Sequence, residues 1–187
     1  MKAMNRVEVF TIGHSNHAVG QFIALLSQHG VNVLVDIRRF PSSHRLPHFS
    51  RTRLTTVLSA SDIDYHWLES LGGHRKEDLA NSPNDAVREP SFRKNADHML
   101  GDEFREGIDR LLEIAENKRT AIMCAEKSYR DCHRSLTSDF LIASGIAVHH
   151  ILSNGELATH EMTAGAKIRD GNVTYPESRP LFDTADE

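Results

Sequence analysis

The sequence predicts an α/β domain whose mostly parallel sheet carries helices on both faces. Three observations support this: strand and helix patterns alternate along the chain, several strand segments are largely apolar, and amphipathic segments separate them. Parallel neighbours need right-handed crossovers, and these place helices against the sheet. We therefore expect a Rossmann-like, three-layer architecture in one domain, residues 1–187, with its core at about 6–160.

The first half of the chain supplies three predicted strands and two helices. Residues 7–12 are mostly apolar and end at Gly13, which predicts a buried strand. Apolar residues then recur at helical spacing over 19–26, and Gly30 is expected at the C′ position of that helix. A second buried strand covers 31–37, a short helix lies near 54–58, and a short strand follows at 64–68.

The second half begins with a polar stretch, residues 74–90, which is expected to form an exposed loop or lid. A helix over 104–115, a strand over 120–125, a helix over 136–143 and a last core strand over 146–152 complete the pattern. Gly145 is expected to end the helix before it. After Gly155 the chain is polar, and its acidic end, Asp183 to Glu187, is expected to fray.

Composition narrows the class of protein. Hydrophobic residues make up 39% and charged residues 26%, which is typical of globular chains. No apolar run reaches the roughly 18 residues that span a bilayer, and residues 1–6 do not resemble a secretory signal. The expected location is the cytoplasm, without a membrane partner. There, Cys124 and Cys132 are expected to be thiols rather than a disulfide framework.

A basic strip interrupts an otherwise acidic chain. The net charge is −4, yet residues 38–61 contain no Asp, Glu or Lys. The five arginines of this strip are Arg38, Arg39, Arg45, Arg51 and Arg53, and the strip also contains His44 and His48. Such a strip favours a specific anionic partner, and a solvated face is the alternative. Phe49 lies within it; such an aromatic residue is more often part of the core, but phenylalanine interleaved with arginines would also suit a nucleobase beside phosphates.

Polar clusters follow four of the predicted strands. They are Gly13-His14-Ser15, Asp36 with Arg38 and Arg39, Gly72-Gly73-His74-Arg75, and Cys124-Ala125-Glu126. Because ligands bind outside the carboxyl ends of parallel strands, these clusters are expected to meet at one edge of the sheet. Asp36 and Arg38 are two residues apart, so their side chains leave the same face, either to form a structural ion pair or to aim Arg38 at a substrate.

The segment from Cys124 to Arg134 allows several kinds of chemistry. Asp131 could cap a helix that begins near Cys132, and an anion bound at that helix would favour Arg134 in its first turn. Alternatively, Arg134 pairs with a nearby carboxylate. Glu126 could act as general acid or base, or could form a buried pair with an arginine.

The two cysteines of the same segment allow two further interpretations. The spacing from Cys124 to Arg130 matches cysteine-phosphatase loops, but the segment has no glycine and carries two carboxylates, so we discount a phosphatase loop. Cys132 at a helix start could still be an acidic thiol. Cys124, Cys132, His133 and His14 could ligate a metal, although no closely spaced cysteine pair is present. We therefore expect neither a metal nor another cofactor.

Taken together, these segments resemble a known family. The residues that carry the resemblance are Thr11-Ile12-Gly13-His14-Ser15, Val35-Asp36-Ile37-Arg38, Pro41-Ser42-Ser43, Phe49, Leu71-Gly72-Gly73, Met123-Cys124-Ala125-Glu126, Cys132-His133-Arg134, Val148 and His150-Ile151. They cover roughly the first 160 residues and are similar to the family called domain of unknown function 488. The resemblance implies an α/β domain and no particular activity.

The leading hypothesis is an enzyme that acts on a phosphate-bearing substrate, a nucleotide or nucleic-acid component. The catalytic candidates are Glu126, His14 and Asp36, and the substrate-binding candidates are Ser15, Arg38, Gly72, Gly73, Cys132, His133 and Arg134. The alternative is a non-catalytic module that responds to metal or redox state through Cys124, Cys132 and His133. A third possibility is that the cluster only braces the loops.

Overall fold

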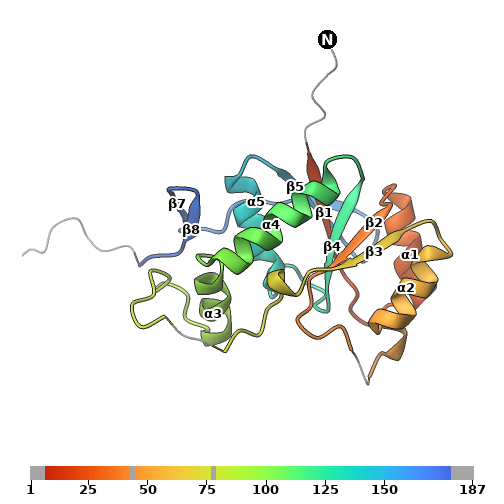
Figure 1. The fold of residues 1–187 in the computed structure, drawn as a ribbon, viewed down its shortest axis with the longest axis horizontal. Coiled ribbons are helices and arrows are strands. Elements are labelled where there is room, and N and C mark those ends of the chain that lie inside the picture. Colours follow the sequence, from red (N-terminus) through yellow and green to blue (C-terminus); the bar gives the residue numbers. More distant parts are fainter. Residues whose placement is uncertain (1–6, 43–44, 77–78, 178–187) are drawn as a thin grey trace, which may run out of the picture.

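A computed structural model describes residues 7–42, 45–76 and 79–177. The predicted fraying end, Asp183 to Glu187, lies outside the described residues, as do residues 1–6 and His44 of the basic strip. In the described part, the structure forms the predicted three-layer α/β fold (Figure 1). No helix within these ranges is long and apolar enough to cross a bilayer.

The main sheet has six strands in the order β3-β2-β4-β1-β5-β6. The strands are β1 (Glu8–Gly13), β2 (Val33–Asp36), β3 (Asp64–Trp67), β4 (Thr120–Cys124), β5 (Ala147–Ile151) and β6 (Leu157–Thr159). All pairs in this sheet are parallel except β5 with β6, which run antiparallel. The first five strands therefore end at a common carboxyl edge, as the sequence predicts.

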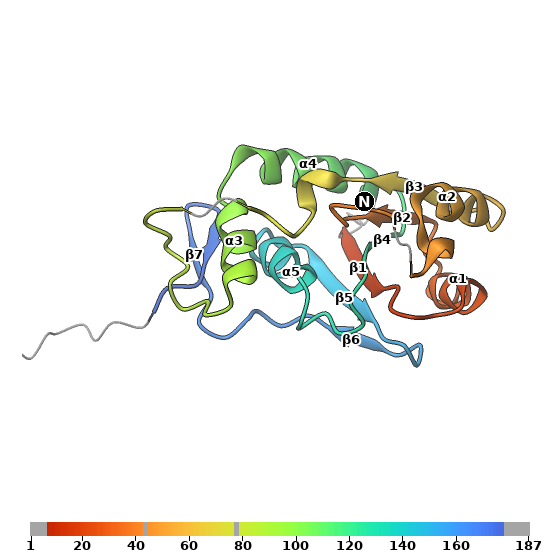
Figure 2. The same ribbon diagram turned by 90° about the horizontal axis from the view of Figure 1, so that it is seen from below.

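Two apolar clusters lie on opposite faces of the sheet. Helices α1 (Val19–Gln28) and α2 (Arg51–Ser59) cover one face, where their leucines pack on Phe10, Leu34 and Met123. Helices α4 (Asp102–Ala115) and α5 (Arg134–Ala143) cover the other, against residues such as Val35 and Ile122. Alternation along each strand sends successive side chains to opposite faces, which is why two separate cores form. Figure 2 shows the same layers from below.

Several elements were not predicted from the sequence. They are α3 (Pro90–His98), the short 3₁₀ turns η1 (Pro47–Phe49) and η2 (Glu69–Leu71), the strand β6, and a hairpin of β7 (Lys167–Arg169) and β8 (Asn172–Thr174). The core also extends past residue 160, because Val173 and Tyr175 are buried in the α5-side cluster. Within the predicted loop 74–90, Asn84 is fully buried and hydrogen-bonded to Asp97.

Two of the three residues predicted to lie at helix ends occupy the predicted positions. Gly30 and Gly145 adopt positive φ, 64° and 81°, just beyond α1 and α5, as expected of C′ glycines. The predicted N-cap Asp131 was wrong, because α5 starts at Arg134 and His133 occupies the N-cap position. The sulfur of Cys132 instead accepts the backbone N–H of Arg134 at 3.4 Å. A side chain two residues before the helix thus takes the role expected of Asp131.

Candidate functional site

The polar segments after the parallel strands meet at one edge because the strands are in register there. Gly13 lies opposite Cys124, and Asp36 lies opposite both Met123 and Trp67. The chain continues the pairing beyond the strands, since the N–H groups of His14 and Ser15 donate to the carbonyls of Cys124 and Ala125 at 2.9 Å. The cluster that the sequence predicts at the carboxyl edge is therefore a real spatial grouping.

Asp36 anchors the middle of this edge. Its carboxylate is fully buried and accepts hydrogen bonds from Arg38 Nε and Nη2 at 2.6–3.1 Å, and from the Tyr65 hydroxyl at 2.7 Å. Burial alone would lower the pKa of Arg38, but hydrogen bonding and charge attraction from Asp36 raise it. Arg38 also donates to the carbonyl of Phe49 at 2.8 Å. The predicted Asp36–Arg38 pair exists, and its geometry is that of a buried ion pair that fixes the Arg38 side chain.

His14 is held against this pair as a neutral imidazole. Nη1 of Arg38 lies 3.3 Å from His14 Nε2, so that nitrogen accepts, and Nδ1 donates to the carbonyl of Ser15 at 2.9 Å. The ring also stacks on Phe49, with centroids 4.3 Å apart. Burial, together with the charge of Arg38, lowers the pKa of His14 to about 4. Because Phe49 is itself fully buried, it does not offer a face to a nucleobase.

Glycines allow the edge loops to approach one another. A Cβ at Gly13 would lie 1.9 Å from the carbonyl oxygen of Glu126, and one at Gly72 would meet the Arg39 backbone at 2.9 Å. A Cβ at Gly73 would lie 2.9 Å from Nδ1 of His133. Gly72 and Gly73, predicted as substrate-binding residues, thus serve close packing between the loops in the described structure.

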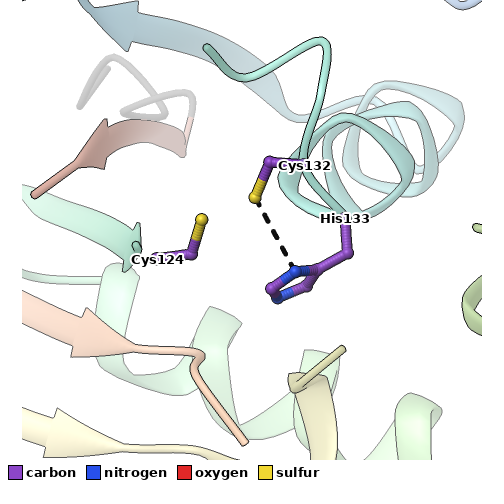
Figure 3. Close-up of side chains that lie close together, drawn as sticks. All are labelled: Cys124, Cys132 and His133. Atoms are coloured by element: carbon purple, nitrogen blue, oxygen red, sulfur yellow. Dashed lines mark hydrogen bonds between the residues drawn. The ribbon is translucent and has the colours of Figure 1, made fainter. Parts of the chain in front are cut away.

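Cys124, Cys132 and His133 form the most unusual group at the edge (Figure 3). Cys124 ends β4, Cys132 and His133 precede α5, and one ligand atom from each lies within 4.8 Å of the others. Cys132 Sγ is 3.7 Å from His133 Nδ1. Both cysteines are buried, about 2% exposed, and both are free thiols, as expected.

The two thiols differ in acidity. Burial alone would raise the pKa of Cys132, but hydrogen bonds with Cys124 and His133, and the charge of Arg134, lower it. Burial and the neighbouring Cys132 raise the pKa of Cys124. Since the Cys132 sulfur also accepts a helix N-terminal N–H, it is the sulfur that the protein favours as a thiolate.

Arg134 is buried and the Glu126 side chain is exposed, and the sequence could not show this difference. Arg134 is only 1% exposed; its Nη2 donates to the backbone carbonyl of Glu126 at 2.6 Å, and its Nε has no hydrogen-bond partner in the described part of the chain. Burial alone would lower the pKa of Arg134, but the sulfurs of Cys124 and Cys132 raise it. The Glu126 side chain, by contrast, is exposed. Arg134 therefore contacts Glu126 through the backbone carbonyl and not, as the alternative interpretation of the sequence had it, through a carboxylate.

A pocket of about 350 Å³ opens over this group. That volume suits a small molecule. The residues that line the pocket are Arg38, Arg39, Phe40, Gly73, His74, Ser91, Phe92, Asn95, Cys124, Ala125, Glu126, Asp131, Cys132 and His133. Of the predicted site residues, the pocket brings together Arg38, Gly73, Glu126, Cys132 and His133. The lining does not include His14, Ser15, Asp36, Gly72 or Arg134.

Sequence reasoning missed the wall of the pocket that α3 supplies. Ser91, Phe92 and Asn95 come from this helix, whose polar sequence does not stand out from the loop before it. A signal was present: Pro90 stands at N1 of α3, and Glu89 at the N-cap accepts the backbone N–H of Phe92 at 2.7 Å. Arg39, which the sequence places in the basic strip and at the end of the second strand but not among the site residues, is 30% exposed and lines the pocket as well.

The fold and the site define a class: a three-layer α/β protein with a thiol–imidazole pocket at the carboxyl edge of its sheet. The family model described as "Domain of unknown function DUF488" matches residues 18–141, and the chain belongs to this family. The match includes β2, β4 and the Cys124–Arg134 segment, and β1 with His14 precedes it. The comparisons with curated proteins and with solved structures give no match.

Proposed function

We propose that the protein is an enzyme that acts on a small phosphate-bearing substrate, a nucleotide or a nucleic-acid component, in the pocket at the carboxyl edge. One observation carries the proposal: the same 350 Å³ pocket is lined by two arginines, two carboxylates (Glu126 and Asp131) and a buried thiol beside a half-buried imidazole. Cationic, acid–base and nucleophilic groups that converge in one concave site are the usual signature of an active site.

Binding of the anion is assigned chiefly to Arg39. Its ion pair with Glu69 is long, 3.9 Å, and its guanidinium is partly exposed. Arg38 uses Nε and Nη2 within the protein, so its charge is balanced by Asp36. Arg38 therefore supplies a fixed wall of the pocket, and His14 positions it through the contact with Nη1. Asp36 likewise acts through Arg38 rather than on the substrate.

Glu126 is the proposed general acid or base. Its side chain is exposed at the pocket, where a carboxylate can exchange protons with both water and a bound substrate. The backbone of Glu126 is fixed by Arg134, which gives the side chain a defined origin. A partial contribution from the Cys132–His133 pair, as nucleophile and proton acceptor, is compatible with the same pocket.

The experiment compares wild type with Glu126→Gln on a panel of nucleotides and oligonucleotides, by thermal shift and by turnover. We expect a phosphate-bearing ligand to raise the melting temperature of both proteins, and Glu126→Gln to lower turnover roughly 10²-fold or more. Glu116→Gln is the matched control, because Glu116 is exposed beyond α4, at the opposite edge of the sheet. If no ligand of the panel shifts the wild type, the proposal fails.

A second candidate function rests on the cysteines alone. Two buried thiols beside one imidazole would suit a non-catalytic module that responds to metal or redox state. In that case mild oxidant would remove both free thiols, and Cys124→Ser would abolish the response. Two free thiols that persist after oxidant, in protein that holds no metal, would exclude this candidate.

A further inference from the structure

We propose that Cys124, Cys132 and His133 form a binding centre for one thiophilic divalent cation, Zn²⁺ in the first instance, with a coordination position open to the pocket. The centre goes beyond the proposed function, because metal binding requires no particular substrate. Among the described residues, this is the group of three potential ligands whose donor atoms all lie within 4.8 Å of one another.

The spacing of the donor atoms fits a tetrahedral ion. Bond lengths of about 2.3 Å to sulfur and about 2.0–2.1 Å to nitrogen imply a sulfur–nitrogen separation of roughly 3.6 Å across a tetrahedral angle. Cys132 Sγ and His133 Nδ1 are 3.7 Å apart. Cys124 faces them from the end of β4 (Figure 3), so small side-chain rotations complete a three-ligand set.

The imidazole of His133 is oriented as a ligand. Its Nε2 lies 3.1 Å from the carbonyl oxygen of Ile37, and a carbonyl can only accept, so Nε2 carries the proton. Once a metal displaces the proton that Nδ1 shares with Cys132, the lone pair of Nδ1 faces the sulfurs. Metal-bound histidines typically donate their second nitrogen to a backbone carbonyl in this way, which fixes the tautomer and the ring. The adjacent residues Cys132 and His133 converge here because the hydrogen bond to the Ile37 carbonyl orients the His133 ring toward Cys132.

The pocket supplies the open position. Cys124, Cys132 and His133 all line it, so a bound ion would face the cavity on its fourth side. Three protein ligands and one open position are the arrangement of catalytic rather than structural zinc sites. Two sulfur donors and one imidazole also select against Mg²⁺ and Ca²⁺, which prefer oxygen ligands.

Arg134 determines what the open position accepts. Two thiolates balance a divalent ion, and the buried guanidinium beside them then leaves one positive charge, with its Nε unpartnered among the described residues. An anionic fourth ligand would neutralise that charge, because a buried charge is stable only when it is paired. Hydroxide or an oxygen of a phosphate-bearing substrate meets this requirement, which connects the ion to the chemistry of the pocket.

The test measures metal in the full chain. We expect about one Zn²⁺ per chain after reduced, purified protein is mixed with ZnCl₂ and desalted, and a thiolate-to-Co²⁺ charge-transfer band after loading with CoCl₂. Cys124→Ser, Cys132→Ser and His133→Gln should each weaken Zn²⁺ binding at least tenfold. His149→Gln is the control, since His149 lies on β5 beside Glu8 and away from the pocket, and should leave binding unchanged.

Two results would overturn the inference. One is folded wild type, with two titratable thiols and native circular dichroism, that retains no Zn²⁺ and shows no Co²⁺ band. The other is Zn²⁺ binding by His133→Gln that is as tight as that of the wild type. If a cysteine variant does not fold, His133→Gln and the wild-type spectrum still decide the question. Glu126→Gln keeps all three ligands and should retain the metal. Wild type that binds Zn²⁺ but is shifted by no ligand of the nucleotide panel would count against the proposed function alone.

Discussion

Asp36 shows at the scale of one residue how the edge is organised. A fully buried carboxylate is unstable unless it is paired, and here Arg38 and Tyr65 together satisfy it. The consequence is a fixed guanidinium, against which His14 packs as a neutral ring. A buried ion pair thus determines the protonation state of a neighbouring histidine, because a protonated His14 would place a second cation beside Arg38.

The neutral state of His14 makes stability depend on pH. Its pKa is about 4 in the folded protein and about 6.5 in an unfolded chain, so the unfolded state takes up the proton first as pH falls. The stabilisation from His14 is therefore complete above about pH 6.5 and is lost as pH falls toward 4. Across that window it amounts to about 2–3 kcal/mol.

His14→Gln should remove this dependence. We expect its free energy of unfolding, measured in urea at several values between about pH 7 and pH 4.5, to fall less steeply with acid than that of the wild type. The comparison isolates one group, since the other titratable residues are common to both proteins. A difference between the two proteins that stays constant over this range would contradict the argument.

At the scale of elements, the site depends on how closely β1 approaches the loop after β4. Gly13 ends β1, and the carbonyl oxygen of Glu126 occupies the space where a Cβ would stand. That same carbonyl accepts from Arg134. The glycine therefore links three elements: a strand end, the loop that carries Glu126, and the first turn of α5.

Gly13→Ala should displace the loop that carries Glu126. We expect a loss of about 1–3 kcal/mol in unfolding free energy, because the backbone must shift to admit the methyl group. Substrate turnover or metal binding, whichever is observed, should fall as well.

Gly20→Ala is the matched control for this substitution. Gly20 lies in α1, and no atom stands within 4 Å of the place that an added methyl group would take. Alanine there should be neutral or stabilise by up to about 1 kcal/mol, because it favours the helix. Equal stability of the two variants would contradict the role assigned to Gly13.

At the scale of the whole molecule, a buried polar chain ties the C-terminal segment to the sheet. Thr11 bonds His150, His150 bonds His160, and His160 bonds Asp139, with distances of 2.7–2.9 Å. Because the Asp139 carboxylate can only accept, Nε2 of His160 donates to it, Nε2 of His150 donates to Nδ1 of His160, and Nδ1 of His150 accepts from the Thr11 hydroxyl. Burial lowers the pKa of His150 to about 3. Tyr175 closes the chain by donating to Asp139 at 2.7 Å.

Tyr175→Phe should loosen the attachment of the C-terminal segment. The buried carboxylate would lose one donor, and hydrogen bonds to charged groups are worth about 1.5–3 kcal/mol, so we expect a loss of that size in urea unfolding. Amide hydrogen exchange should also rise across β7 and β8. Tyr129→Phe serves as the control, since the Tyr129 ring stacks on His150 and its hydroxyl makes no hydrogen bond within the described residues. An unchanged midpoint for Tyr175→Phe would show that the segment is held by apolar packing alone.

The sequence by itself determined the layers, the parallel strands and the common edge. Periodicity and apolar runs act locally, and five strands with their crossover helices follow from them. The residues at the strand ends could be predicted for the same reason. Parallel strands in register bring Gly13, Asp36 and Cys124 to one edge, independently of the conformation of the loops. The helix α3 was within reach of the sequence, through Glu89 and Pro90, and was missed because the segment is polar.

Only the tertiary structure decided what each edge residue does. Whether Glu126 is buried, whether Arg38 is already paired, and which way the His133 ring turns all depend on contacts between segments far apart in the chain, such as Ile37 with His133. The same holds for Tyr175, whose partner Asp139 lies 36 residues away. Burial, charge pairing and tautomer are properties of the packed neighbourhood, and no local pattern of residues encodes them.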